Sequence, residues 1–443
     1  MVTIVSSLVS EFLSWFKFYC YNNDQYGRAA FHVALGQLLK EQKIVKGGRR
    51  LDGRFNIFVM GLPSSGKSAG MDPIMHIMGA LGMKTTHPDD FSDVSLVGNF
   101  ESIKVKEGDK TVTRYEFRPG AMSDCDILYL DEASVLFAKN PPQYATKAKT
   151  FLQKALNPLD SKSNAIEITR RSGQTAEIHP HCSIYLTSFP LIEMEDVITR
   201  TGMLQRMFIL NMDDSEDVRH ANDMMDIDML GVDVDVSMSS EIVERFAIIK
   251  ETFTGSISWE WNVAKPVLRK SVDQLHSMKT HSNETVKRIM MTFIPRYKDM
   301  LYVLSMHHAV MRMEEVMKMD FSGPVQIEVS DVQYARNMVL DSMSHILSVI
   351  ERSYAISKQA NIDKSMTLRT INLAYRRVPN DNKDEEGNVP MDDLLQQCIV
   401  VWGISRESAK SKLREYKNYL VIESKKVGDK TKYMVRPRQE VKT

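Results

Sequence analysis

The residues best suited to chemistry lie early in the chain, in the run Gly61-Leu62-Pro63-Ser64-Ser65-Gly66-Lys67-Ser68. This run fits G-x-x-x-x-G-K-[ST] and directly follows the apolar, β-prone residues 56–60. In such a loop the glycines let backbone N–H groups face a β-phosphate at a helix N-terminus, the lysine reaches the β and γ oxygens, and the serine ligates Mg²⁺. The sequence therefore predicts a site for ATP and Mg²⁺, cradled by Gly61, Pro63, Ser64, Ser65, Gly66, Lys67 and Ser68.

A second apolar run, residues 127–130, ends in the adjacent acids Asp131 and Glu132. A phosphate loop needs one acid that orients Mg²⁺ and one that activates water, both at the end of a neighbouring buried strand. Asp131 would hold the metal, together with Ser68, and Glu132 would polarise the attacking water. An ordinary strand ending in exposed acids is the alternative interpretation. Adjacent Asp and Glu at this place favour the additional-strand ATPases, including AAA+ proteins, over small GTPases.

A third apolar strand is predicted at residues 181–190, and a resemblance to AAA+ architecture would place it between the first two strands. It ends in Thr187 and Ser188, either of which could contact the γ-phosphate or the water, and we assign that role to Ser188. Arg206 is predicted on a short helix just before another apolar strand. It is a candidate arginine finger, donating its charge to the γ-phosphate of a neighbouring subunit.

Two hairpins are predicted from alternating sequence. Residues 95–105 and 111–117 flank one turn, and residues 165–171 and 175–178 flank another. Taken singly, each fits an ordinary surface hairpin. Basic residues lie near both turns, namely Lys106, Arg170 and Arg171.

In this order, these features resemble the AAA+ module of the minichromosome maintenance (MCM) helicases, in which two such insertions project into a central pore. The segment from Ser95 to Ser134 looks like the family's insert and acidic strand, and GMLQRM is similar to its arginine-finger motif. Residues 296–309 and 329–335 are similar to its helical lid, which implies that Arg296 is sensor 2. The resemblance covers about residues 50–350. It implies a homohexameric ring in which Arg206 and Arg296 act in trans, with Lys106, Arg170 and Arg171 contacting DNA in the pore.

Three departures from that family are visible. Only about sixty residues precede the phosphate loop, which we take as too few for a zinc-bearing N-terminal domain. Phe189 stands where the family has its sensor 1 Asn, and the loop reads LPSSGKS, where MCM proteins commonly carry Ala before Lys. A compact viral or plasmid relative therefore fits better than a cellular replicative MCM.

A winged helix is predicted at the C-terminus, as in MCM proteins. A helix opens at residue 391, Ser405 caps a second helix, and strands are expected at 419–425 and 432–435. Basic residues expected on the second helix and at the wing tip could meet DNA phosphates, namely Arg406, Lys410, Lys417 and Lys430. Use of this module for protein contacts is the alternative.

Composition limits the class of protein. The 443 residues carry 57 Lys and Arg against 57 Asp and Glu, which excludes a histone-like or polybasic binder. Four separated cysteines with no C-x-x-C pair argue against a disulfide framework or structural zinc and suggest an intracellular, reducing compartment. Residues 2–20 are too often interrupted by polar residues for a membrane span and predict an amphipathic helix, so no membrane partner is expected.

Charged residues are distributed unevenly along the chain. Residues 213–235 hold nine acidic residues against Arg219 alone, whereas residues 404–443 hold twelve Lys and Arg against five acids. We therefore expect an N-terminal helical segment, an AAA+ core, an acidic linker, a helical lid and a winged helix. Their respective ranges are 1–50, 51–212, 213–240, 241–360 and 361–443.

The fold class expected from these features is α/β: an AAA+ ATPase core with two hairpin insertions, a helical lid and a winged helix. The expected function is that of an ATP-dependent DNA helicase or translocase in replication, with a primase or loader as a further candidate partner. Two alternatives stay open. One is a protein-remodelling ATPase like the MoxR, McrB or chelatase relatives, and the other is a DNA-bound loader or transposition regulator that does not unwind.

Overall fold

The chain is described by a computed structural model, which divides it into two compact units, Met1–Ser353 and Tyr354–Thr443. The described residues are 7–20, 23–62, 65–88, 90–107, 110–137, 142–169, 174–189, 202–212, 215–232, 236–278, 281–315, 324–402, 405–427 and 430–437.

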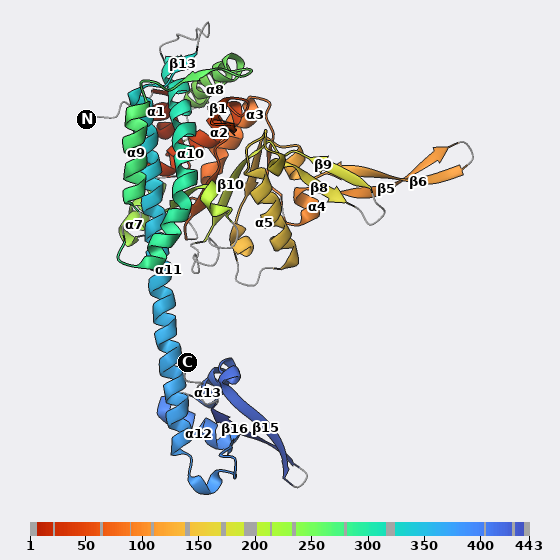
Figure 1. The fold of residues 1–443 in the computed structure, drawn as a ribbon, viewed down its shortest axis with the longest axis vertical. Helices are drawn as coiled ribbons and strands as arrows, with labels where there is room; N and C mark the ends of the chain where they lie inside the picture. Colours follow the sequence, from red (N-terminus) through yellow and green to blue (C-terminus); the bar gives the residue numbers. More distant parts are fainter. Residues whose placement is uncertain are drawn as a thin grey trace. The chain divides into compact units, whose positions relative to one another are not determined.

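The first unit is a mixed α/β structure around a five-stranded parallel sheet (Figure 1). The strand order is β11-β3-β10-β7-β4, so the third predicted strand lies between the first two, as expected. Every residue of β3, β7 and β10 is buried, as in a parallel sheet covered on both faces. The strands are β3 (Ile57–Met60), β4 (Thr85–Thr86), β7 (Ile127–Leu130), β10 (Ser183–Ser188) and β11 (Phe208–Asn211).

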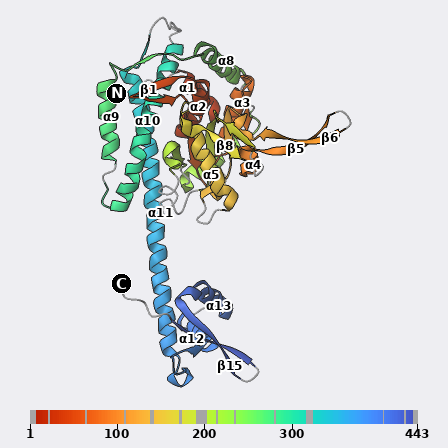
Figure 2. The ribbon, with the colours of Figure 1, turned by 45° about the vertical axis from the view of Figure 1, so that its right-hand side comes forward.

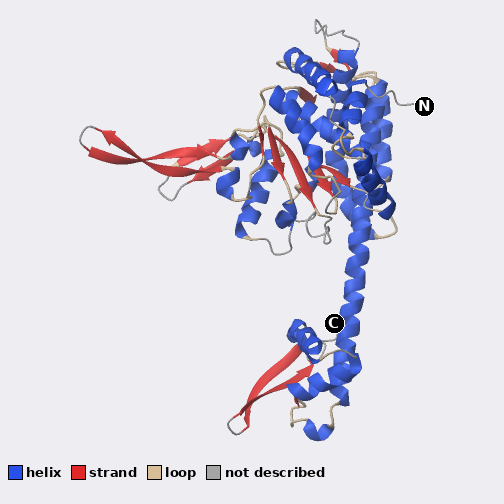
Figure 3. Cartoon of the chain, turned by 180° about the vertical axis from the view of Figure 1, so that it is seen from behind, coloured by secondary structure: helices blue, strands red, loops and turns tan. Residues whose placement is uncertain are grey.

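Both predicted hairpins are present, each as a separate two-stranded antiparallel sheet. Figures 1 and 3 show them leaving the body of the unit on the same side. They consist of β5 (Gly98–Glu107) with β6 (Lys110–Pro119), and β8 (Ile166–Thr169) with β9 (Thr175–Ile178). The short elements around them are η1 (Ala69–Met71), α3 (Asp72–Ala80), α4 (Asp93–Leu96), η2 (Ala121–Ser123), η3 (Ala133–Phe137), α5 (Gln143–Ala155), η4 (Lys162–Asn164) and η5 (Leu204–Arg206).

The N-terminal helices α1 (Ser7–Phe16) and α2 (Asp24–Leu38) belong to the core of this unit rather than to a segment of their own. Phe12 of α1 packs edge-on against Phe31 of α2, with ring centroids 5.4 Å apart. On α2, Tyr26 reaches the phosphate loop, and Gln37 reaches Ser183 at the start of β10. The helix therefore runs along the sheet and backs the loop. The hairpin β1 (Lys43–Lys46) and β2 (Arg49–Asp52) follows it.

Helices dominate the rest of the unit, and Figures 1 and 2 show α9, α10 and α11 side by side. The Tyr297 hydroxyl accepts a hydrogen bond from the Ile209 N–H and donates to the Met207 carbonyl, both at 3.1 Å, which joins α10 to β11. The predicted acidic linker, residues 213–240, contains the helix α7. The elements are α7 (Glu216–Asp228), α8 (Val236–Thr252), β12 (Trp259–Glu260), α9 (Lys265–Ser277), α10 (Glu284–Glu315), β13 (Val325–Gln326) and α11 (Val329–Arg377). None of the helices in the described part of the chain combines the length and the apolarity that a membrane crossing needs.

A buried chain of hydrogen bonds ties α2 to α10 and α11. His307 Nε2 lies 2.7 Å from the Gly53 carbonyl oxygen, an acceptor, so this nitrogen carries the proton and His307 Nδ1 accepts. His32 Nδ1, 3.1 Å away, must then donate, and its Nε2 accepts from the Tyr334 hydroxyl at 2.9 Å. This network therefore needs both imidazoles neutral.

Acid should weaken the fold through these histidines. Burial lowers the pKa of His307 from 6.5 to about 4, and burial, followed by the charge of His307, lowers the pKa of His32 well below its ordinary value. Below about pH 6.5 these histidines become protonated in the unfolded chain but stay neutral in the folded chain. The free energy of unfolding should therefore fall by about 1.4 kcal/mol for each pH unit of acidification and for each imidazole. Urea unfolding at pH 7 and pH 5 measures this. His307→Gln should flatten the slope, whereas His179→Ala, at an exposed histidine, should keep it. Equal stability at both pH values contradicts the prediction.

The second unit has its own core, formed by residues of α11, two further helices and a three-stranded sheet of order β14-β16-β15. The two helices and two strands predicted here are confirmed, and the end of α11 adds a further helix through Ile371 and Ala374, with Val378 just after its last residue. One detail of the prediction is wrong: α13 ends at Glu415, so Lys417 lies on the following 3-10 turn and not on the helix with Arg406 and Lys410. The elements are η6 (Asn380–Asn382), β14 (Val389–Pro390), α12 (Met391–Trp402), α13 (Arg406–Glu415), η7 (Lys417–Tyr419), β15 (Leu420–Val427) and β16 (Lys430–Pro437).

Candidate nucleotide site

The phosphate loop and the two acids meet at the carboxyl edge of the sheet. The loop follows β3 and the acids follow β7, and both strands run parallel on either side of β10. The Ser68 hydroxyl lies 3.1 and 3.0 Å from the two carboxylate oxygens of Asp131. Hard oxygen donors of this kind suit Mg²⁺, which keeps several waters and phosphate oxygens among its ligands. The predicted pairing of Ser68 with Asp131 is therefore present.

The residue of β10 that faces these acids is Thr187. Its hydroxyl donates to Asp131, and it accepts a bond from the Glu132 N–H at 3.3 Å. Neighbouring residues of a strand point to opposite faces, so Ser188 points away. Its hydroxyl is buried and has no hydrogen-bond partner within the described residues. The structure therefore places Thr187, and not Ser188, against the acids, and we move the proposed role to Thr187.

Asp131 is held as a carboxylate. Burial raises the pKa of its carboxyl group, but hydrogen bonds from Thr187, Ser68 and the Glu132 N–H outweigh burial and bring that pKa below its ordinary value. Glu132 has φ of +50°, the one positive φ at a non-glycine position among the described residues. Strained backbone of this kind is concentrated at functional sites, where the surroundings must hold it. Here the Glu132 N–H is held at 2.9 Å from Asp131 Oδ1.

The phosphate-loop lysine is enclosed by residues that the motif does not indicate. Lys67 is 5% exposed, and its ammonium group lies 4.8 Å from the centre of the Phe189 ring. From α2, the Tyr26 hydroxyl donates to the Lys67 carbonyl and accepts from the Tyr185 hydroxyl. Gly70 leaves room for this, because a Cβ there would lie 2.4 Å from the Tyr26 ring. A glycine two residues after the motif was the sequence signal for this close approach.

The two predicted trans-acting arginines lie together at the opposite, amino edge of the sheet. Arg206 precedes β11, and Arg296 lies on α10 in the same pocket. The carboxylates of that pocket are already paired, Asp52 with Arg54 and Asp299 with Lys46. Burial, and then the charge of Arg296, lower the pKa of Arg206 to about 10. Arg206 and Arg296 are thus two cations in a pocket whose carboxylates already pair with other residues. The pocket therefore favours binding of an anion that belongs to another molecule.

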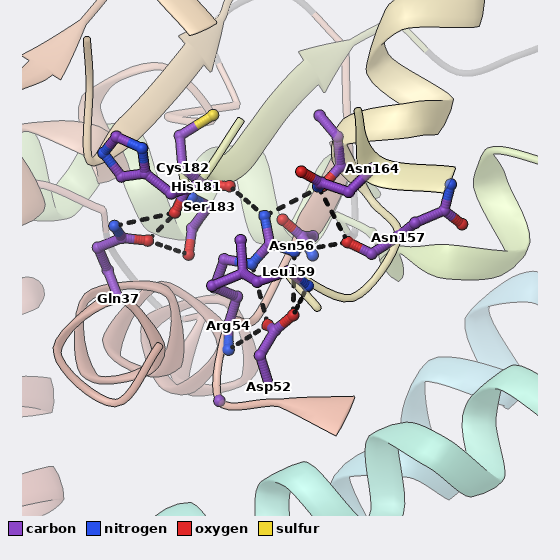
Figure 4. A network of polar contacts seen from close by, with 12 residues as sticks. Gln37, Asp52, Arg54, Asn56, Asn157, Leu159, Asn164, His181, Cys182 and Ser183 are labelled. Carbon is purple, nitrogen blue, oxygen red and sulfur yellow. Dashed lines mark hydrogen bonds and ion pairs between the residues drawn. The ribbon is translucent and has the colours of Figure 1, made fainter. Parts of the chain in front are cut away.

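Figure 4 shows a buried network of polar contacts that includes Asp52 and Arg54, two residues that line the same pocket. Arg54 is 6% exposed and donates to the carbonyls of Ala155, Asn157 and Cys182 at 3.0, 2.7 and 3.2 Å. Gln37 accepts hydrogen bonds from the N–H and the hydroxyl of Ser183. The network therefore joins the loops that enter β3 and β10 next to the pocket of Arg206 and Arg296.

Of the remaining predicted site residues, some are described by the structure and some are not. Lys106 is exposed on β5, and Gly61, Ser65 and Gly66 lie in the phosphate loop as expected. In the second unit, Lys410 and Lys417 are exposed, and Arg406 pairs with Asp392 at 3.0 Å. Lys430 begins β16. Pro63, Ser64, Arg170 and Arg171 lie outside the described residues.

Comparisons with known proteins give no family. Neither the protein-family models nor the curated protein sequences contain a match to the chain. Within the described residues no group of three or more His, Cys, Asp or Glu could hold a metal ion. The geometry of Lys67, Ser68, Asp131 and Thr187 therefore carries the functional argument.

Proposed function

We propose that the chain is an AAA+ ATPase that assembles into a hexameric ring around DNA and uses ATP hydrolysis to translocate along it or to unwind it. The observation that carries the ATPase part is the contact of the Ser68 hydroxyl with both carboxylate oxygens of Asp131, at the edge of the sheet where the phosphate loop ends. The inserted strand β10 is what this class of ATPase requires, and it supplies Thr187 to the same site.

Each site residue has a defined task in hydrolysis. Lys67 neutralises the β- and γ-phosphates, and Ser68 with Asp131 positions Mg²⁺. When bound, Mg²⁺ supplies neutralisation of the charge on the phosphate oxygens. Glu132, exposed at the end of β7, accepts a proton from the attacking water. Thr187 holds the Asp131 carboxylate and the Glu132 N–H in register.

Arg206 and Arg296 act on the ATP of a neighbouring subunit. The phosphate loop follows the last residue of β3, whereas Arg206 precedes the first residue of β11, which lies beside β3 in parallel. A strand rises about 3.3 Å per residue, so about 10 Å or more of sheet separates the arginines from the chain's own phosphate loop. A head-to-tail contact between copies brings them to the next loop, and repetition of that contact closes a ring.

The β5–β6 hairpin supports DNA as the molecule inside the ring. Residues opposite each other in its register share a face. One face carries Lys104 and Lys106 with Tyr115 opposite Ser102 and has no acidic side chain among its described residues. The other face carries Arg114 and Arg118, but also Glu101 and Glu116. A face with cations, an aromatic ring and no carboxylate suits the backbone and bases of a single strand.

The C-terminal unit supports the same proposal. Its helix, short strand, two helices and hairpin have the order of a winged helix, a common DNA-binding module. On α13, Arg406 and Lys410 are exposed, four residues apart. They lie on one face of the helix, where they would contact phosphates, with Lys417 and Lys430 beyond its end.

Unwinding of a forked duplex tests the proposal. Glu132→Gln should bind ATP but not unwind. Lys104→Ala combined with Lys106→Ala should weaken single-strand binding and reduce its dependence on salt by about 1.4 in log–log slope, because two phosphate contacts are lost. The matched control removes the same charge from the other face, with Arg114→Ala and Arg118→Ala, and should bind nearly as wild type does. Arg170→Ala tests the second hairpin in the same assay.

Two results would count against the proposal at different levels. An ATPase rate that single-stranded DNA does not change, with no unwinding, would remove the helicase or translocase function and leave an ATPase for another client. Equal losses from the two double variants would remove the assignment of the hairpin faces alone.

A further inference from the structure

A buried hydroxyl lies beside the nucleotide site without a hydrogen bond. Tyr129 of β7 is 4% exposed, and its hydroxyl oxygen is buried and has no hydrogen-bond partner within the described residues. Buried polar groups in proteins are nearly always hydrogen-bonded, either to protein or to ordered water, so an exception calls for an explanation. This hydroxyl therefore indicates a partner that binds to the chain from outside.

Tyr129 lies on the same face of the sheet as the site residues. Side chains alternate between the faces of a strand, so Tyr129 shares its face with Asp131, two residues later. On the neighbouring strand, Tyr185 lies opposite Tyr129 in the register, and Thr187 follows on that same face. Burial raises the pKa of the Tyr129 hydroxyl to about 12, and neighbouring Ser68 and Thr187 oppose that rise. The hydroxyl is thus close to the groups that we expect to hold Mg²⁺.

The ring of Tyr129 packs between two aromatic neighbours. Its strand β7 lies between β10 and β4. From β10, the ring of Tyr185 lies 5.4 Å from it between centroids, and His87, directly after β4, lies 4.7 Å from it. The Tyr185 hydroxyl is already bonded to that of Tyr26. Contacts from both sides hold the Tyr129 ring in place, so its hydroxyl is preorganised at the site.

A water of the Mg²⁺ hydration shell is the partner that these surroundings suit. Mg²⁺ keeps several waters when it binds to carboxylates and phosphates. Such a water gives a lone pair to the metal and therefore acts mainly as a hydrogen-bond donor. A tyrosine oxygen can accept that bond while its proton goes to a carboxylate such as Asp131. A phosphate oxygen suits the position less, because it would lie beside the negative charge of Asp131.

We propose that Tyr129 is a further residue of the metal site, whose hydroxyl donates to the Asp131 carboxylate and accepts a hydrogen bond from a water of the Mg²⁺ shell. This inference rests on the proposed ATPase function. It adds a residue that neither the phosphate-loop motif nor the pair of acids specifies. The hydroxyl then contributes to the binding of Mg²⁺ with ATP and not to the folding of the empty chain.

Removal of the hydroxyl tests this proposal. In Tyr129→Phe, the Mg²⁺ concentration for half-maximal binding of a fluorescent ATP analogue should rise by about five-fold, the effect of one lost hydrogen bond. Binding of the analogue in EDTA should stay as in wild type. Urea unfolding without nucleotide should show equal or greater stability, because the change removes a buried hydroxyl that the described part of the chain leaves unpaired.

Tyr297→Phe is the matched control. It also removes one buried tyrosine hydroxyl, but this one is hydrogen-bonded to the backbone beside β11. This variant should therefore unfold at a lower urea concentration than wild type and keep the wild-type Mg²⁺ dependence of analogue binding. The two variants separate an effect on the metal from an effect on the fold.

A double-mutant cycle tests the link to Asp131. In an Asp131→Asn background, Tyr129→Phe should change the Mg²⁺ dependence by less than about two-fold, because both groups hold the same ion. A five-fold effect that persists in that background would overturn the link. If wild type needs Mg²⁺ to bind the analogue tightly and Tyr129→Phe leaves that dependence unchanged, or if Tyr129→Phe destabilises the empty chain, the inference is wrong and the proposed function stands. If wild type binds no analogue, or binds it equally well without Mg²⁺, both fail.

Discussion

Asp131→Asn is expected to lower ATP hydrolysis by about a hundred-fold or more, the range seen when one preorganised charged group is lost from an active site. The carboxylate receives hydrogen bonds from Thr187 and Ser68, which hold it in place and charged. An asparagine side chain has the same shape but no charge, and its amide nitrogen would donate a hydrogen bond where one carboxylate oxygen now accepts one. The Mg²⁺ concentration for half-maximal hydrolysis should therefore rise as well. Steady-state phosphate release at several Mg²⁺ concentrations measures both effects.

Three further variants show whether the effect belongs to the metal position. Glu132→Gln should also abolish hydrolysis but keep the Mg²⁺ dependence of ATP binding, since Glu132 acts on water. Thr187→Val should give a partial loss because the carboxylate loses its nearest donor, whereas Ser188→Ala, on the opposite side of the strand, should be close to wild type. An Asp131→Asn enzyme with normal Mg²⁺ dependence, or a Ser188→Ala defect as large as that of Thr187→Val, would contradict the geometry described above.

The elements that the sequence predicted best are those that local pattern determines. The apolar runs at 127–130 and 183–188 became buried strands, and both hairpins formed because their strands alternate and are close in sequence. The N-terminal helices were predicted as helices but not placed. Their position depends on contacts far along the chain, such as Gln37 with Ser183 and His32 with His307, which no local period encodes.

The candidate site divides in the same way. Lys67, Ser68 and Asp131 were found because the motif fixes their spacing and parallel strands bring their ends to one edge. The choice between Thr187 and Ser188 needed the phase of β10, and a shift by one residue turns a side chain to the other face. Tyr26 could not be found from the motif, because it reaches the Lys67 carbonyl from a helix about forty residues earlier. Lys417 was misplaced because the end of α13 was expected too late.

Arg206→Ala is expected to reduce ATP hydrolysis by about a thousand-fold in the assembled protein, the lower end of the effect of an arginine finger. Its guanidinium lies beside Arg296, with the nearby Asp52 and Asp299 already engaged by Arg54 and Lys46. Loss of Arg206 therefore removes one of the two cations that this pocket offers to the phosphates of a neighbouring subunit. Nucleotide binding by the same chain should stay near normal, because Lys67 and Ser68 lie at the other edge of the sheet. Phosphate release and binding of a fluorescent ATP analogue measure the two properties separately.

Mixing two inactive variants distinguishes action in trans from action within one chain. Lys67→Ala lacks a working phosphate loop but keeps Arg206, and Arg206→Ala has the reverse defect. In rings mixed at equal amounts, about a quarter of the head-to-tail interfaces combine an intact loop with an intact arginine, so hydrolysis should return to well above either variant alone. Mixing either variant with itself gives no such interface, and Arg269→Ala, at an exposed arginine of α9, should be fully active alone. If the mixture is as inactive as its components while it still assembles, Arg206 serves its own subunit, and the head-to-tail arrangement on which the ring depends is wrong.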